Sequence, residues 1–382
     1  MNDRIKIVAD DKIPFLKGVL EPFLDIEYYP GKEITRDKIL DADALIIRTR
    51  TKCNEKLLTG TPVKIITTAT IGYDHIDADY CFDNHLVWKN APGCNSTSVQ
   101  QYIASVLLNL AEKYNFNLSE KTIGIVGVGN VGSKVAKLAR AFGMKVLLND
   151  PPRERAEGSE NYVSLDEIIK ESDIITFHVP LNMEGEDKTF HLADENFFGK
   201  LERKPIIINS SRGEVIKTEA LINAIKEGKV SVTVNDVWEN EPQISQELLQ
   251  LSEFATPHIA GYSADGKANG TAACINAIRE FFELDLKPFW YPERIPLPEN
   301  ASVINVDCLG KTEQQILFEV INYTYDVHSD DRKLRSSVNT FEKQRGDYPI
   351  RREFPAYTVN FKDAWEKITD TLISLGFNVS QS

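Results

Sequence analysis

The sequence predicts an α/β protein with two Rossmann-like domains, each built on a doubly wound parallel sheet, and a small C-terminal α+β domain. Three observations lead to this fold class. Short apolar segments alternate with helical segments over roughly the first 290 residues, which is typical of parallel sheets. A glycine-rich turn, G-V-G-N-V-G, stands between one such strand and the next helix. After a proline-rich linker at residues 288–298, the last segment of about 85 residues has a strand and helix pattern of its own.

The first region has apolar strand segments at residues 4–9, 44–47 and 65–69, and a helix is predicted at residues 15–20. Loops at residues 48–52 and 68–72 follow the second and third strands. Ligands in such sheets bind beyond the carboxyl ends of the strands. Arg48 and Arg50 are therefore candidates for binding an anionic group, although an ordinary solvated loop would show the same pattern.

Two long amphipathic helices are predicted at residues 96–114 and 264–284. They lead the chain into a middle region and out of it, so this region is inserted into the first. Its strands are expected at residues 123–126, 144–148, 173–179, 204–209, 230–237 and 254–259. Residues 164–167 resemble a capping box that opens a helix, and residues 151–159 are expected to form an exposed, charged loop. In the last region, strands at 301–306 and 356–361 alternate with helices at 312–324 and 363–375.

The glycine-rich turn has the spacing of a dinucleotide-binding site. Gly127 makes the tight turn, Gly129 lets backbone approach a pyrophosphate, and Gly132 lets the helix pack on the strand. The helix N-terminus offers free N–H groups to the phosphates. Asp150 ends the next strand, where a carboxylate binds the ribose hydroxyls and repels a 2′-phosphate. The pattern predicts NAD rather than NADP as the cofactor; the alternative is a glycine-rich turn in an ordinary βαβ unit.

The composition excludes several other classes of protein. A net charge of −13 argues against binding to nucleic acid or to anionic membranes, and 42% hydrophobic residues argue against disorder. The five cysteines form no C-x-x-C pair, which is typical of reduced thiols in a cytoplasmic protein. The six histidines form no H-E-x-x-H motif, so no metal site is expected. We expect neither a signal peptide nor a membrane span.

Three polar residues stand at the ends of consecutive predicted strands: Arg212, Glu241 and His258. An arginine fork binds a carboxylate through two parallel hydrogen bonds. A histidine can take a hydroxyl proton while hydride leaves the same carbon, and a glutamate beside it orients the ring and raises its pKa. Each residue alone has a structural explanation, such as a common turn or a buried histidine. Together they suit the oxidation of a hydroxy acid.

Several motifs resemble those of the D-2-hydroxyacid dehydrogenase family: G-V-G-N-V-G, F-H-V-P-L, N-S-S-R-G, D-V-W-E-N-E-P and T-P-H-I-A-G-Y. The resemblance covers about residues 1–290. It implies that the catalytic residues are Arg212, Glu241 and His258, and that Asp236 holds the nicotinamide carboxamide. It further implies that the cofactor is lined by Asn130, Val131, Val179, Ser210, Ser211 and Gly261.

The motif F-E-K-Q-R-G-D-Y-P-I-R-R-E-F at residues 341–354, together with T-A-T-I-G-Y-D-H-I-D at residues 68–77, resembles one branch of this family. That resemblance implies NAD-dependent oxidation of 4-phospho-D-erythronate in vitamin B6 synthesis and a homodimer formed through the C-terminal domain. It also implies substrate contacts from Thr49, Thr70 and Tyr262. Arg48 and Arg50 become candidates for binding the 4-phosphate.

The expected domains are a flavodoxin-like substrate-binding domain at residues 1–98 and 263–290, an NAD-binding domain at 99–262 and a dimerisation domain at 291–382. Two alternatives stay open. The first is another D-2-hydroxyacid dehydrogenase, acting on 3-phosphoglycerate or a simple hydroxy acid. The second is a non-catalytic NAD-sensing protein on the same fold, which turnover of any hydroxy acid would distinguish.

Overall fold

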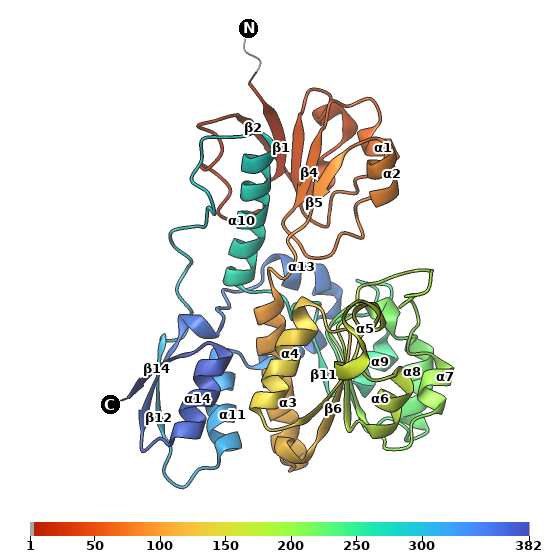
Figure 1. Cartoon of the computed structure of the whole chain (residues 1–382), viewed down its shortest axis with the longest axis vertical. Coiled ribbons are helices and arrows are strands. Elements are labelled where there is room, and N and C mark those ends of the chain that lie inside the picture. Colours follow the sequence, from red (N-terminus) through yellow and green to blue (C-terminus); the bar gives the residue numbers. More distant parts are fainter. Residues whose placement is uncertain (1–3, 382) are drawn as a thin grey trace. The chain divides into compact units, whose positions relative to one another are not determined.

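A computed structural model describes residues 4–381 of the chain (Figure 1). The chain divides into two compact units. Unit 1 comprises Met1–Asn95 and Ser263–Pro296, and unit 2 comprises Ser96–Tyr262 and Leu297–Ser382. Every sheet in both units is parallel, which confirms the predicted α/β class.

Unit 1 has a five-stranded sheet in the order β2-β1-β3-β4-β5. Its strands are β1 (Lys6–Asp10), β2 (Asp25–Tyr29), β3 (Ala44–Ile47), β4 (Ile65–Thr68) and β5 (Val87–Lys89). Helix α10 (Ala264–Phe281) covers one face through Ile275 and Ile278. The short helices α1 (Glu55–Leu58) and α2 (Ala78–Asp83) contribute Leu57 and Cys81 to the apolar cluster on the other face. The sheet is thus covered on both sides, as parallel sheets usually are.

Unit 2 has a six-stranded sheet in the order β11-β10-β9-β8-β6-β7. Its strands are β6 (Thr122–Val126), β7 (Lys145–Asn149), β8 (Ile174–Phe177), β9 (Ile206–Asn209), β10 (Val232–Asn235) and β11 (Phe254–Ala255). The chain leaves β6 toward β7 and then returns to β8 on the other side of β6. The connections after β6 and β8 therefore leave in opposite directions, and doubly wound sheets bind ligands at such a point.

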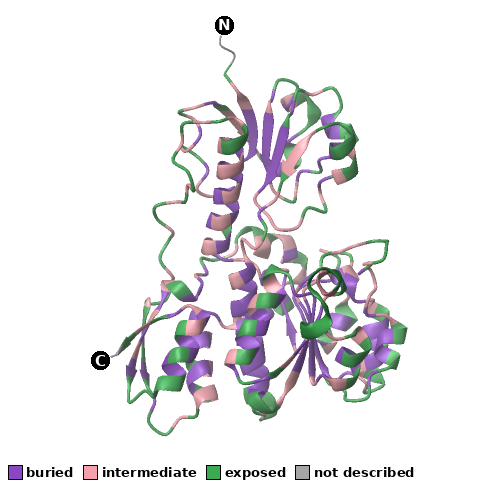
Figure 2. Cartoon of the chain, in the orientation of Figure 1, coloured by how far each residue is buried: buried purple, intermediate pink, exposed green. Residues whose placement is uncertain are grey.

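Helices cover both faces of this sheet. One face packs against α3 (Ser96–Tyr114) and α4 (Asn130–Ala141). The other packs against α6 (Leu165–Glu171), α7 (Glu195–Gly199), α8 (Thr218–Lys226) and α9 (Gln246–Leu251). Figure 2 shows the strands buried and the outer sides of these helices exposed. None of the helices described is long and apolar enough to cross a membrane.

The C-terminal part of unit 2 has a three-stranded sheet in the order β12-β13-β14. Its strands are β12 (Val303–Asp307), β13 (Thr358–Lys362) and β14 (Asn378–Gln381), and its helices are α11 (Glu313–Thr324), α12 (Val327–Ser336), α13 (Phe341–Gly346) and α14 (Glu366–Leu375). Helix α11 packs on α3, α14 packs on α4, and α12 packs on the edge strand β11. This part therefore shares one hydrophobic core with the six-stranded sheet.

Two predicted segments differ from the structure. Residues 15–20 form turns rather than a helix, because Phe15 and Gly18 adopt left-handed φ values of 63° and 86°, which a right-handed helix does not allow. Residues 151–159 were expected to be a loop, but helix α5 spans Pro151–Glu157. Asp150 caps this helix, and prolines at its first positions are pre-organised for a helical start.

Candidate active site

The glycine-rich turn connects β6 to α4 and fits a dinucleotide. Gly127 has a φ of +89°, and a Cβ there would lie 2.7 Å from Cγ1 of Val179, which follows β8. A Cβ on Gly132 would lie 1.9 Å from the Gly127 carbonyl oxygen, so the helix can approach the turn only because residue 132 is glycine. A Cβ on Gly129 would have no neighbour within 4 Å, so this side of the turn is open. The tight turn at Gly127 and the close packing at Gly132 agree with the predicted roles, while the approach of Gly129 to a pyrophosphate stays a prediction.

The start of α4 provides the predicted anion-binding geometry. The helix begins at Asn130, Val131 belongs to its first turn, and no side chain caps its N-terminus. Its first N–H groups and the positive end of the helix dipole can therefore face a pyrophosphate. Asp150 stands beside the turn, because its Oδ2 accepts a hydrogen bond of 2.7 Å from the Val128 N–H. The Asp150 carboxylate, the predicted ribose ligand, is thus held beside the glycine-rich turn.

Other predicted cofactor residues follow β9 and β11. The hydroxyl of Ser211 donates to Asn209 Oδ1 at 2.9 Å, so it is used within its own turn. The hydroxyl of Ser210 is buried and has no hydrogen-bond partner among residues 4–381. That unpaired group fits a bound polar molecule better than an empty turn, since buried hydroxyls are normally hydrogen-bonded. Gly261 lies just beyond the residues that pack on Asp236.

Asp236, which follows β10, is fully buried and holds the segment after β11. Its Oδ1 accepts from the Thr256 hydroxyl at 2.6 Å and from the Ile259 N–H at 2.8 Å, and its Oδ2 accepts from the Ala260 N–H at 2.9 Å. Burial raises the pKa of Asp236, and His258 is the main influence that opposes this rise. One lone pair of Oδ2 is left for a further donor, such as a carboxamide.

His258 and Glu241 form a close pair. Nδ1 of His258 lies 2.8 Å from Oε2 and 3.1 Å from Oε1 of Glu241. Burial acts to raise the pKa of Glu241, but the charges of His258 and Arg345 and the Trp238 N–H outweigh it, so the pKa lies below the usual 4.5. An ionised carboxylate only accepts hydrogen bonds, so Nδ1 carries the proton. Nε2 of His258 is then the basic nitrogen and can take a proton from a substrate.

The backbone of His258 is strained and tightly held. Its φ of 56° lies in the left-handed region, which costs a non-glycine residue about 1 kcal/mol or more. The N–H of His258 donates to the Asp236 carbonyl at 2.7 Å, and the Asp236 side chain binds the next two N–H groups. These bonds fix the unusual conformation and with it the direction of the imidazole.

Arg212 follows β9 and is brought to the same edge of the sheet. Strands β9, β10 and β11 are adjacent and parallel, so the segments that carry Arg212, Glu241 and His258 all leave at their carboxyl ends. A Cβ on Gly213 would lie only 1.9 Å from the carbonyl carbon of Trp238. The chain after Arg212 therefore lies directly on the segment that leads to Glu241. Sequence reasoning missed this role of Gly213, although the Arg-Gly motif contained it.

The predicted substrate residues of unit 1 lie at the carboxyl ends of β3 and β4. Arg48 forms two hydrogen bonds to the fully buried carboxylate of Asp10, from Nε at 3.1 Å and from Nη2 at 3.0 Å. Thr49 is exposed and Arg50 is half-buried. The Thr70 hydroxyl bonds to Gly72 O at 2.9 Å. Arg48 is thus already paired with a carboxylate, which the sequence pattern did not reveal.

Two arginines of the C-terminal segment lie beside the segments that carry Glu241 and His258. Arg345 places Nη1 3.8 Å from Oε2 of Glu241. The fully buried Arg351 donates through Nη2 to Ala260 O at 2.5 Å and to Ser98 O at 3.1 Å. Tyr262, the predicted substrate residue of unit 2, meets the ring of Tyr348 edge-on with 5.7 Å between centroids. The charged motif at residues 341–354 was noticed in the sequence, but its link to Glu241 was not.

Comparisons with known proteins agree with this geometry. A family model described as D-isomer specific 2-hydroxyacid dehydrogenase, NAD binding domain, matches residues 97–260, and one described as a domain of unknown function matches residues 297–376. The chain is 52% identical over 356 residues to the erythronate-4-phosphate dehydrogenase of Bacteroides thetaiotaomicron, with 93% of this chain and 99% of the relative covered. It is 38% identical over 382 residues to that of Proteus mirabilis, with 98% and 100% covered. The solved structure of Aquifex aeolicus D-lactate dehydrogenase with NAD and lactic acid has a TM-score of 0.62 and 28% identity, and covers 73% of this chain and 95% of that one.

Proposed function

Because this chain belongs to the erythronate-4-phosphate dehydrogenase family, we propose that it oxidises 4-phospho-D-erythronate at C2, with NAD as the cofactor. The product is 2-oxo-3-hydroxy-4-phosphobutanoate, an intermediate of pyridoxal 5′-phosphate (vitamin B6) synthesis. The observation that carries the proposal is the His258–Glu241 pair, which follows β11 and β10 beside the Arg212 segment. A protein that only senses NAD has no use for this acid–base pair.

The residues of the site divide the chemistry among them. NAD, when bound, accepts the hydride that leaves C2. Arg212 binds the C1 carboxylate, because a guanidinium fork matches the two carboxylate oxygens. His258 takes the hydroxyl proton at Nε2, and the Glu241 carboxylate stabilises the imidazolium that results. General base catalysis of this kind contributes about 10²–10⁴ to the rate.

For the 4-phosphate, Arg48 and Arg50 are both candidates in unit 1. Asp10 already neutralises Arg48 and occupies its Nε and Nη2. Arg50→Ala should raise the KM for the phosphorylated substrate far more than for erythronate. Arg48→Ala should do the same and should also destabilise the protein, since it removes a cation that pairs with the buried Asp10. Equal losses on both substrates would contradict the assignment of the phosphate to this loop. Thr49, Thr70 and Tyr262 remain proposed substrate contacts.

The direct test of the function is NADH formation with 4-phospho-D-erythronate, erythronate and 3-phosphoglycerate as parallel substrates. We expect a clear preference for 4-phospho-D-erythronate. Preference for another hydroxy acid would keep the catalytic residues and refute the substrate. Absence of turnover with any hydroxy acid would favour the non-catalytic alternative. We place the enzyme in the cytoplasm, in line with its five free cysteines.

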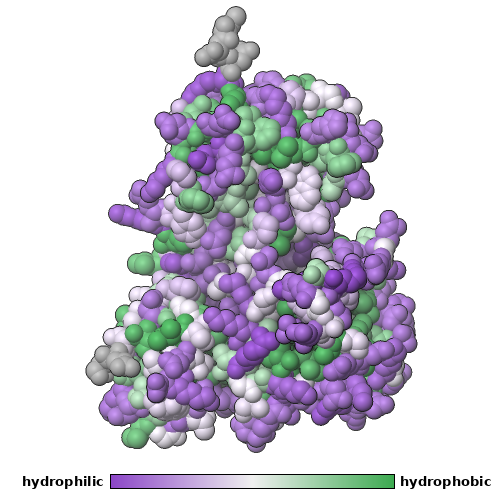
Figure 3. Space-filling model, in the orientation of Figure 1, coloured by the Kyte–Doolittle hydropathy of each residue, from purple (hydrophilic) through white to green (hydrophobic). Residues whose placement is uncertain are grey.

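We also propose a homodimer formed through the three-stranded sheet. Helices α11 and α14 lie on one face of this sheet (Figure 1). On β12 the other face exposes Val303, Asn305 and Asp307, although parallel sheets are usually covered on both faces. Figure 3 shows a mostly hydrophilic surface with scattered apolar patches, including one in the region of this sheet and its helices. A second copy of the chain would cover the open face.

Light scattering on the full-length protein tests the dimer. Val303→Lys, on the open face, should convert dimers to monomers, because it places charge in the interface. Leu40→Lys, at an equally exposed apolar residue of unit 1, should not. A wild-type monomer, or dimers that survive Val303→Lys, would refute this interface.

A further inference from the structure

The side chain of Arg345 is held in a closed environment beside the catalytic carboxylate. Only 16% of it is exposed, and its Nη1 lies 3.8 Å from Oε2 of Glu241. The rings of Tyr262 and Phe341 lie 5.9 and 6.0 Å from its guanidinium carbon. Its Nε is buried and has no hydrogen-bond partner within residues 4–381. The guanidinium is therefore fixed in place by neighbours and directed at Glu241, not free in solvent.

We propose that Arg345 is a positioning residue for the acid–base pair: its guanidinium shares the Glu241 carboxylate with His258 and so limits how strongly that carboxylate stabilises a protonated imidazole. The C-terminal segment would then complete the catalytic centre of its own chain, in addition to any role in association. The proposal rests on the proposed dehydrogenase function but not on the identity of the substrate, since Arg345 acts through Glu241.

The segment that carries Arg345 is anchored on the catalytic strand exit. Arg351 follows α13 and donates to the carbonyls of Ala260 and Ser98 in the same unit. Its guanidinium carbon also lies 4.5 Å from the centroid of the Tyr325 ring. Helix α13 is thus tied at its C-terminal side to residues just after His258. This attachment fixes the position of Arg345.

The charges around the pair determine the sign of the effect. Glu241 faces His258 from the β11 exit, Arg345 from α13 and the N–H of Trp238. His258 is also near the buried Asp236, and Arg345 also faces Glu342 at 3.5 Å. A cation beside Glu241 weakens the electrostatic attraction between its carboxylate and a protonated imidazole. Loss of Arg345 should therefore strengthen the attraction between Glu241 and a protonated imidazole, so that the acidic limb of kcat/KM moves to higher pH.

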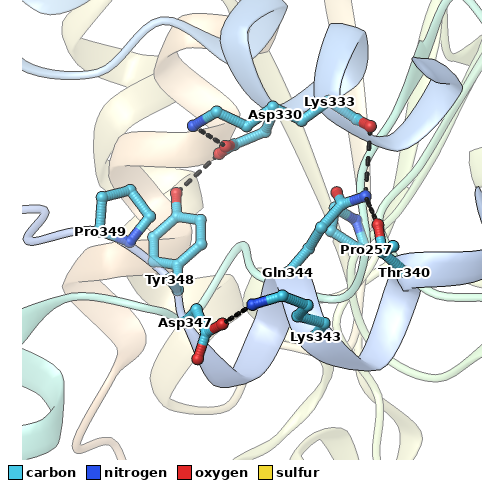
Figure 4. A pocket seen from close by; sticks show the side chains of 9 residues that line it. All are labelled: Pro257, Asp330, Lys333, Thr340, Lys343, Gln344, Asp347, Tyr348 and Pro349. Atoms are coloured by element: carbon cyan, nitrogen blue, oxygen red, sulfur yellow. Dashed lines mark hydrogen bonds and ion pairs between the residues drawn. The ribbon is translucent and has the colours of Figure 1, made fainter. Parts of the chain in front are cut away.

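A matched control lies two residues away on the same helix. Lys343 is 73% exposed and pairs with Asp347, not with Glu241. Figure 4 shows this ion pair at the edge of a cavity of about 280 Å³ that Pro257, Asp330 and Tyr348 also line. Lys343→Gln removes the same charge from α13 without touching the acid–base pair.

The experiment is the pH profile of kcat/KM for NAD-dependent oxidation, measured with wild type, Arg345→Gln, Arg345→Lys and Lys343→Gln. Arg345→Gln should move the acidic limb upward by about 0.5–1 pH unit, which lowers kcat/KM about three- to ten-fold on that limb. In Arg345→Lys the acidic limb should lie close to its wild-type pH position, and in Lys343→Gln that position should be unchanged. Thermal unfolding and NAD titration show whether each variant is folded.

The outcomes separate the possible roles of Arg345. An unmoved limb in Arg345→Gln, with lower kcat at every pH, would show a merely structural role and overturn the proposal. A higher KM for the phosphorylated substrate alone, with an unmoved limb, would make Arg345 a phosphate ligand and also overturn it. If Arg345→Gln does not fold, an unmoved limb combined with wild-type activity in Arg345→Lys supports the proposal, whereas a limb moved upward in Arg345→Lys overturns it. If wild type prefers another hydroxy acid, the same profiles are measured with that substrate.

Discussion

Replacing Gly213 by alanine should strongly reduce activity, although Gly213 takes no part in the chemistry. Its φ is not in the left-handed region, so alanine meets no backbone strain there. The added Cβ would instead lie 1.9 Å from the carbonyl carbon and 2.1 Å from the carbonyl oxygen of Trp238. Real Cβ contacts are longer than about 3 Å, so one backbone segment must move by roughly 1 Å.

The movement would reach the catalytic residues from both sides. Gly213 follows Arg212 directly, and the Trp238 N–H donates to Glu241 Oε1 at 3.0 Å. The Trp238 indole also donates to Thr256 O at 2.9 Å, two residues before His258. A misplacement of about 1 Å in a catalytic group costs about 10²-fold in rate. Overpacking of a filled core costs about 1–3 kcal/mol in stability.

Gly199→Ala is the matched control, because a Cβ at Gly199 has no neighbour within 4 Å and its φ is also unstrained. The assay compares kcat, the midpoint of urea unfolding and NAD affinity in the two variants. Gly213→Ala should lose about 10²-fold in kcat and remain folded, while Gly199→Ala should match wild type. Wild-type kcat in Gly213→Ala would refute the steric argument, since the backbone would then have room that the structure does not show.

Three further predictions concern charge. Glu241→Gln should lower kcat by about 10²-fold or more, because an amide cannot stabilise the imidazolium. The pKa of Glu241 is depressed in the folded protein, so the stability that its ionised form contributes is present above pH 4.5 and is lost as the pH falls below it. Wild type should therefore lose more unfolding free energy than Glu241→Gln in this range, and parallel losses would contradict the pairing. Burial lowers the pKa of His178 from 6.5 to about 3, so between pH 7.5 and pH 5 the unfolded chain binds a proton that the folded chain does not. In urea unfolding, the free energy of unfolding of wild type should therefore fall by about 2 kcal/mol more than that of His178→Gln over this range. Equal losses would show that the His178 side chain is accessible to water. Asp150→Asn should bring the affinities for NAD and NADP closer together in fluorescence titrations, and Asp150→Ala should in addition lose about 1 kcal/mol because Asp150 caps α5; an unchanged preference for NAD would contradict the ribose assignment.

The sequence predicted most of the sheet-forming strands because they are short, apolar and bounded by turns, but it did not predict the edge strands β2, β5 and β14. Residues 44–47 and the helix at 96–114 agree with β3 and α3 at both ends. Asp150 was seen as a ribose ligand, but the same residue was not recognised as the cap of α5. The helix predicted at residues 15–20 is wrong because two residues with left-handed φ values interrupt an apolar pattern that is otherwise typical of a helix.

The site was predictable where motifs report local geometry and not where it depends on distant contacts. The order of Glu241 and His258 after two strands was enough to place them at one edge of a sheet. Nothing in the sequence distinguishes the basic residues at 331–352 from one another. Arg351 is fully buried on backbone carbonyls, whereas Lys343 is exposed, because only the tertiary fold brings residue 351 to Ser98 and Ala260.

Arg351 and Asp236 bind the same short segment after His258, so the C-terminal region is a structural part of this site. Asp236 binds the N–H groups of residues 259 and 260, and Arg351 binds the carbonyl of residue 260 from the other side. The Aquifex aeolicus D-lactate dehydrogenase structure matches only 73% of this chain. A truncation before residue 297 would therefore not recover a minimal dehydrogenase. It would remove the bond from Arg351 to the carbonyl of residue 260 and expose the side of α3 that packs on α11, so the two parts have to be expressed and engineered together.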